Sequence, residues 1–216
     1  MGLLDRIAPR RSDLEPPPAP SAVVDAPVFA TKALSKFLTL LTSRPSPVLL
    51  DLGTVVGSNV TYFGEQLGCK IFVEDVYADL DRHVRERRIE MLPAFLKARF
   101  PQADASVDGI LCWDLVDYLD RPSAKALADE LMRVLRPDGA LLGFFGTAQP
   151  RDMHYTKYVI LDDLTLKHRA YTAAQGRQAI LLNRDIIRLF SSLRVSDSYL
   201  LQNNNREILF RKPPSS

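Results

Sequence analysis

A short apolar run at 48–52 ends in residues that could bind a ligand. Asp51 and Gly53 stand at its end, and Gly57 follows four residues later, before a helical pattern. Glycines allow a tight turn and a close approach of the backbone to a ligand. A helix that begins after Gly57 would also offer free N–H groups to carboxylate or phosphate oxygens. This spacing predicts a ligand-binding turn between a buried strand and a helix.

Two later apolar runs end in polar residues of the same kind. Glu74 and Asp75 close one run, and Trp113 and Asp114 close the next. A carboxylate after the first of these runs can accept two hydrogen bonds from ribose hydroxyls, whereas Trp113 and Asp114 could meet an adenine ring or a methionine amino group. Because ligands bind beyond the carboxyl ends of parallel strands, we expect these residues and the glycine turn to line one crevice.

The apolar runs alternate with helical patterns along the chain. The runs are nearly all apolar, which is typical of strands that are buried on both faces of a parallel sheet. They lie at 47–52, 70–75, 107–114 and 140–146, and the helical patterns between them lie at 58–67, 78–88, 92–100 and 122–135. This order predicts an α/β fold with a Rossmann-like doubly wound sheet that is mostly parallel.

The N-terminal segment divides into an arm and a helix. Residues 1–25 contain prolines at a density that neither a helix nor a central strand tolerates, so we predict a flexible Pro-rich arm. From 26 to 43, apolar residues recur at helical spacing on one face, which is formed by Leu34, Phe37, Leu38 and Leu41. The folded domain is therefore predicted to span residues 26–212, with a short tail at 213–216.

Two hairpins are predicted after the fourth apolar run. Alternating residues around an Asp-Asp pair predict an inserted hairpin at about 155–172, which either lines a substrate pocket or serves as a packing element or dimer contact. Asn183 is placed to cap a helix. Three asparagines at 203–205 join two strand-like runs within 194–212, so the last strand of the sheet is predicted to be antiparallel.

Composition narrows the classes of function. The formal net charge of +2 does not favour nucleic acid or an acidic membrane as a partner, and no apolar run has the length of a membrane span. The two cysteines, Cys69 and Cys112, lie in or beside apolar runs, where we expect free thiols and hence a cytoplasmic location. We predict no metal site.

These motifs together resemble class I S-adenosylmethionine-dependent methyltransferases. DLGTVVG at 51–57 is similar to that family's glycine loop, and VEDVYADL at 73–80 is similar to its ribose-binding segment. SVDGILCWDLVDYL at 106–119 resembles its fourth-strand segment, and LMRVLRPDGALLGF at 131–144 resembles the turn into its fifth strand. The resemblance implies S-adenosylmethionine as the cofactor, bound by Asp51, Gly53, Gly57, Glu74, Asp75, Trp113 and Asp114.

Two positions depart from the family pattern. Val55 stands where the family has its middle glycine, and we expect a β-branched side chain there to crowd a ligand on the turn. No strand is evident between 78 and 104, so the family's third strand is predicted to be short or absent. Asp104 is the residue that could replace the adenine-contacting acid after that strand.

The function implied by the resemblance is methyl transfer to an acceptor that the sequence does not identify. One alternative is a non-catalytic methyltransferase-like module for binding or assembly, and another is a dinucleotide-binding enzyme, which would require the spacing G-x-G-x-x-G. No residue is identified as catalytic; by position, the candidates for a base are His154, Tyr155 and Tyr118, of which only His154 titrates near neutral pH without help. His83 and His168 are expected at the surface.

Overall fold

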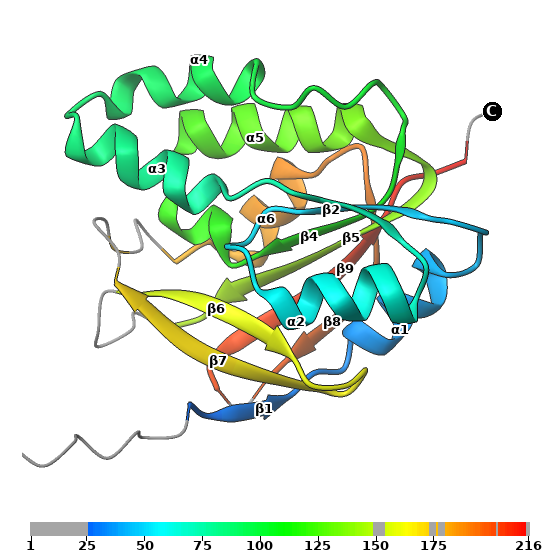
Figure 1. Ribbon diagram of the computed structural model, residues 1–216. Coiled ribbons are helices and arrows are strands. Elements are labelled where there is room, and N and C mark those ends of the chain that lie inside the picture. The colour runs from blue at the N-terminus through cyan, green and yellow to red at the C-terminus, as the bar shows by residue number, and fades with distance from the viewer. Residues whose placement is uncertain (1–25, 149–153, 173–175, 177–179, 202, 215–216) are drawn as a thin grey trace, which may run out of the picture.

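A six-stranded sheet forms the centre of the molecule (Figure 1). The computed structural model describes residues 26–148, 154–172, 176, 180–201 and 203–214, so the predicted arm lies outside the described residues. The strand order is β3-β2-β4-β5-β9-β8, and only β9 runs antiparallel to its two neighbours. The strands are β2 (Val48–Asp51), β3 (Lys70–Val73), β4 (Val107–Trp113), β5 (Leu135–Gly146), β8 (Arg194–Leu200) and β9 (Asn205–Arg211).

This sheet confirms the predicted Rossmann-like fold and its antiparallel last strand. Every residue from 78 to 104 is described and none of them is in a strand, so the third strand of the family pattern is absent here. The strand predicted at 140–146 begins earlier than expected, because β5 already starts at Leu135 and includes residues 136–139 with a shift in its register to β4. Within this irregular part of β5, Asp138 has a left-handed backbone conformation with a φ of 62°.

Helices cover both faces of the sheet (Figure 1). One face packs against α3, α4, α5 and α6, and the other packs against α1 and the segment α2–η1. Their bounds are α1 (Leu34–Leu41), α2 (Gly57–Thr61), η1 (Tyr62–Gln66), α3 (Val76–Arg85), η2 (Ile89–Met91), α4 (Leu92–Lys97), η3 (Leu115–Tyr118), α5 (Arg121–Val134) and α6 (Asn183–Leu189). Local signals set these ends: the Asp120 side chain caps α5 at the N–H of Ser123, and Gly68 ends the α2–η1 segment with a φ of 64°.

A second, three-stranded sheet has the order β1-β7-β6, and we call it the small sheet. It joins β1 (Val28–Ala30) to the hairpin of β6 (His154–Ile160) and β7 (Thr165–Thr172). The apolar stripe of the predicted helix at 26–43 is correct, since its four residues are buried in α1, but residues 28–30 form a strand instead. These residues form a strand because they pair with a distant one, as Ala30 does with Thr165. The local sequence pattern contains no information about such a distant partner.

Three smaller predictions are wrong. Leu182, and not Asn183, is the N-cap of α6, and no side chain there makes a capping hydrogen bond. His83 is 8% exposed, where its Nδ1 lies 2.7 Å from the carbonyl oxygen of Asp79. His168 is also partly buried, because its ring packs between Phe29 and Tyr158.

Candidate cofactor crevice

Asp51 ends β2 and holds the turn that follows. Its side chain is buried, and Oδ1 accepts hydrogen bonds from the N–H of Gly53 at 2.9 Å and from Nε1 of Trp113 at 2.6 Å. Burial raises the pKa of this carboxyl to about 6, although both hydrogen bonds act in the opposite direction. The acid of the glycine turn is therefore engaged by groups of the chain itself.

Trp113, the single tryptophan of the chain, lies directly on the glycine turn. A Cβ built on Gly53 would stand 2.8 Å from both Cδ1 and Nε1 of the indole, so only glycine allows this approach. The indole is 2% exposed and stacks on Tyr158 of β6, with ring centroids 4.9 Å apart and planes inclined by 4°. Trp113 also has a φ of 50°, which non-glycine residues rarely adopt.

A second group of aromatic rings surrounds Asp114, the other polar residue at the end of β4. Tyr77 donates to Oδ1 of Asp114 at 2.5 Å, and Tyr118 donates to Oδ2 at 3.4 Å. Tyr155 packs on both tyrosines, with ring centroids 4.7 and 4.8 Å apart. Burial, followed by the nearby charge of Asp114, raises the pKa of Tyr77, which keeps this hydroxyl protonated as a donor.

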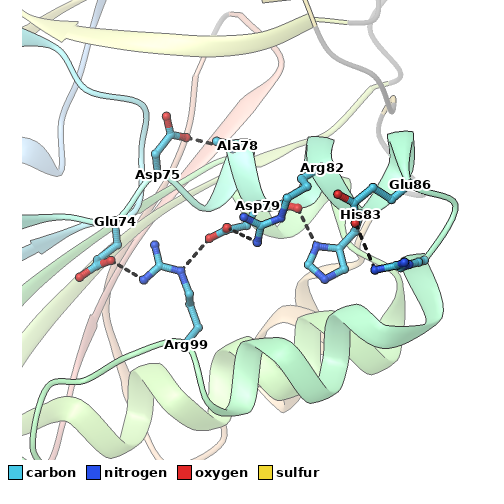
Figure 2. Close-up of polar contacts among 9 residues, drawn as sticks. Glu74, Asp75, Ala78, Asp79, Arg82, His83, Glu86 and Arg99 are labelled. Carbon is cyan, nitrogen blue, oxygen red and sulfur yellow. Dashed lines mark hydrogen bonds and ion pairs between the residues drawn. The ribbon is translucent and has the colours of Figure 1, made fainter.

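Glu74 and Asp75 follow β3 and point in different directions (Figure 2). Glu74 pairs with Arg99 at 2.5 Å and accepts from Gln102 at 3.1 Å. Asp75 accepts from the N–H of Ala78 at 3.1 Å and so caps α3. Partial burial raises the pKa of Asp75, while the charge of Lys157 on β6 lowers it in part. Asp75 is thus the acid that faces the small sheet, and Glu74 is held in an ion pair.

The other two positions of the turn are open. Val55 is 63% exposed and has an ordinary negative φ, and a Cβ added to Gly57 would meet no atom within 4 Å. Val55 therefore has no unfavourable backbone conformation, and its expected crowding of a ligand on the turn stays a prediction. The side chain that occupies the turn is Trp113, which reaches it from β4.

The turn and the two strand ends fall within a segment that matches a known family. The model of that family, described as a methyltransferase domain, matches residues 49–139. A comparison with curated protein sequences gives no match for the chain.

Several solved structures are similar to this chain. The PH0226 protein of Pyrococcus horikoshii OT3 has 14% identity and a TM-score of 0.50, with 83% of this chain and 88% of that chain covered. An S-adenosylmethionine-dependent methyltransferase of Aquifex aeolicus has 14% identity and a TM-score of 0.49, with coverage of 82% and 88%. The 1,6-didemethyltoxoflavin-N1-methyltransferase of Burkholderia thailandensis has 18% identity and a TM-score of 0.46, with coverage of 84% and 77%. At 14% identity, the likeness to the PH0226 protein shows the fold alone.

A methyl donor does not fit against Gly53 with the side chains as they stand. Its methionine half is expected on the glycine turn, where the indole of Trp113 lies against Gly53 and takes up Oδ1 of Asp51. The residues predicted to bind the donor thus follow the carboxyl ends of neighbouring strands, with the indole occupying the turn at Gly53.

Two of the three candidates for a base are buried among these rings. Tyr118 and Tyr155 are 1% and 0% exposed, respectively, and burial together with Asp81 raises the pKa of Tyr155. A protonated phenol is a poor base near neutral pH. His154 begins β6 opposite Thr172, and its side chain lies outside the described atoms. All three assignments stay predictions.

The most informative residue that the sequence did not reveal is Asn59 in α2. It is 2% exposed, its Nδ2 donates to the carbonyl oxygen of Tyr158 at 2.8 Å, and its Oδ1 accepts from the N–H of Ile160 at 2.9 Å. A polar residue on the inner side of an apolar helical stripe was the available signal. Its partners, about a hundred residues away, carry no local signal.

Among the described residues, no group of histidine, cysteine, aspartate and glutamate side chains could hold a metal ion. None of the helices in the described ranges has the length and apolar character to cross a membrane.

Proposed function

We propose that this chain is an S-adenosylmethionine-dependent methyltransferase whose donor crevice is closed in the arrangement described above. The observation that carries the proposal is the family match at 49–139, which includes the glycine turn and the polar ends of β2, β3 and β4. The cofactor, when bound, supplies an electrophilic methyl group, and the protein has to bind and orient the two reactants. The acceptor is an unidentified oxygen, nitrogen or carbon nucleophile.

The residues of the proposed donor site have separate tasks. Gly53 would let the backbone approach the methionine half once Trp113 has moved, and Gly57 already lies beside open space. Asp51 would regain an acceptor oxygen when Nε1 of Trp113 leaves it. Asp75 is the carboxylate that would hold the ribose, since Glu74 is engaged by Arg99.

The location proposed for the enzyme is the cytoplasm. Both cysteines are free and buried, as expected of thiols in a reducing compartment. Burial raises the pKa of both thiols, so neither is poised as a nucleophile.

A second function, a non-catalytic methyltransferase-like module, is favoured by a specific observation. The rings of Trp113 and Tyr158 fill the glycine side of the crevice, and those of Tyr77, Tyr118 and Tyr155 fill the side of Asp114. If these rings never separate, the fold is a scaffold for another partner.

Calorimetric titration with S-adenosylhomocysteine, the product of the donor, distinguishes the two functions. We expect saturable binding to the wild-type protein, and at a hundred times the dissociation constant a stabilisation of about 2.7 kcal/mol, or a rise in Tm of about 5–11 °C. Trp113→Ala, which vacates the glycine turn, serves as a second sample. Absence of heat and of any thermal shift at millimolar ligand in both proteins would exclude the enzyme and favour the module.

A further inference from the structure

The indole on the glycine turn is covered by an aromatic ring of the small sheet. Trp113 belongs to β4 and lies on the turn, and Tyr158 of the small sheet covers it in a parallel stack. Phe144 packs on both rings, with centroids 5.7 Å from Trp113 and 5.1 Å from Tyr158. The position of Trp113 therefore depends on where the small sheet lies.

Asn59 fixes the small sheet at that point. Its side chain binds the backbone of β6 through one donor and one acceptor, on either side of Val159. A neighbouring strand would make the same donor and acceptor bonds with its backbone. Here one amide side chain makes them, from a helix that begins directly after the glycine turn. The turn that would receive the donor and the strand that covers it are thus joined through one residue.

The backbone around these contacts departs from regular structure on both sides. Trp113 occupies the left-handed region with a φ of 50°, and the pairing of β4 with β5 shifts in register between Leu111 and Trp113. The helix that carries Asn59 changes after Thr61 into the π-helical segment η1. Sparsely populated backbone of this kind persists only where surrounding contacts impose it, and it is often found in segments that switch.

We propose that Asn59, Tyr158 and Trp113 form a latch that keeps the methyl donor out of the crevice until the small sheet shifts. In the closed arrangement, the indole takes the place of the donor on Gly53 and its Nε1 occupies Asp51. In the open arrangement, the two bonds of Asn59 are broken, Tyr158 leaves the indole, and Trp113 turns away from the turn. The latch rests on the proposed function, because it presumes that S-adenosylmethionine is the ligand admitted.

A latch of this kind lowers the apparent affinity for the donor by the fraction of molecules that are open. Weakening it must therefore tighten binding, although the changed residue touches no part of the expected donor. Asn59→Ala loses both bonds to β6, whereas Asn59→Asp keeps the acceptor for Ile160 but places a buried carboxylate oxygen against the carbonyl oxygen of Tyr158. With a typical net contribution for each hydrogen bond, we expect the dissociation constant for S-adenosylhomocysteine to fall about thirtyfold in Asn59→Ala, and at least as far in Asn59→Asp.

The matched control is Asp120→Ala. This substitution removes the cap of α5 and destabilises the fold, but it has no contact with the latch, so we expect an unchanged dissociation constant. It separates a specific release from a general loss of stability.

The experiment is calorimetric titration of the full chain with S-adenosylhomocysteine for wild type, Asn59→Asp, Asn59→Ala, Trp113→Ala and Asp120→Ala. Tighter binding in both Asn59 variants, with Asp120→Ala equal to wild type, supports the latch. Binding to wild type with equal or weaker affinity in the folded Asn59→Asp variant overturns the latch and leaves the proposed function in place. Absence of binding in all five proteins, including Trp113→Ala, overturns both.

Discussion

The six-stranded sheet and the small sheet differ in how their strands find their partners. In the large sheet, β2, β3, β4 and β5 are buried apolar runs separated by helices, and their order along the chain follows the pattern of the family. In the small sheet, β1 pairs with β7, which lies far from it in the sequence. One face of the β6–β7 hairpin packs in the same apolar cluster as Trp113. The large sheet therefore carries the segment that matches the methyltransferase-domain model, and in the proposed latch the small sheet controls access to it.

The largest expected difference between the two sheets is in stability. Leu49 of β2 is 0% exposed and Leu166 of β7 is 2% exposed, which makes them a matched pair for truncation. We expect Leu49→Ala to lower the free energy of unfolding by about 4 kcal/mol, because the central sheet cannot collapse around the cavity, and Leu166→Ala to lower it by about 2 kcal/mol. Urea unfolding of both variants measures this, and an equal or greater loss for Leu166→Ala would show that the small sheet is not the more adaptable part.

The scaffold was predictable from the sequence because its signals are local. A continuous apolar run, an acid and a glycine specify β2 and its turn, and the stripe from Leu34 to Leu41 specifies the buried face of α1. The contents of the crevice were not predictable in the same way. The contact of Trp113 with Gly53 and the bonds of Asn59 to β6 join residues far apart in the chain, and no periodicity encodes them.

The second difference concerns pH and resides in His168 of the small sheet. Burial lowers the pKa of His168 to about 4, so the folded chain binds this proton less readily than the unfolded chain. The stability contributed by neutral His168 is complete above about pH 6.5 and is lost as the pH falls towards 4, by about 3 kcal/mol in total. Asp51 has the opposite effect. Its pKa is raised to about 6 in the folded protein, so the folded state loses stability as the pH rises towards 6 and this carboxyl ionises.

His168→Phe isolates this effect, since it keeps a ring beside Tyr158 and Phe29 but cannot titrate. Chemical unfolding of wild type and variant between pH 4 and 7 should give stabilities that diverge as the pH falls, with the variant favoured at low pH. Parallel curves would contradict this account, because they would show that folding does not lower the pKa of His168.

The smallest expected effect separates structure from binding at Asp75. This side chain caps α3, so Asp75→Ala should lower the stability of the ligand-free protein by about 1 kcal/mol, whereas Asp75→Ser retains a capping oxygen and should lower it by only a few tenths. Both variants lose the carboxylate proposed for the ribose, and both should bind S-adenosylhomocysteine more weakly than wild type. Thermal melts with and without ligand measure the two effects, and normal binding by Asp75→Ser would remove this acid from the donor site.

The fluorescence of Trp113 tests the central claim most directly, because it is the only tryptophan in the chain and it is buried on the glycine turn. The wild-type protein is titrated with S-adenosylhomocysteine while its emission maximum and its quenching by acrylamide are recorded. We predict a red shift and stronger quenching that saturate together with binding, as the indole leaves Gly53 and Tyr158. Saturable binding measured by calorimetry with no change in emission or quenching would contradict the account, since the ligand would then be bound while Trp113 still lay in the closed crevice.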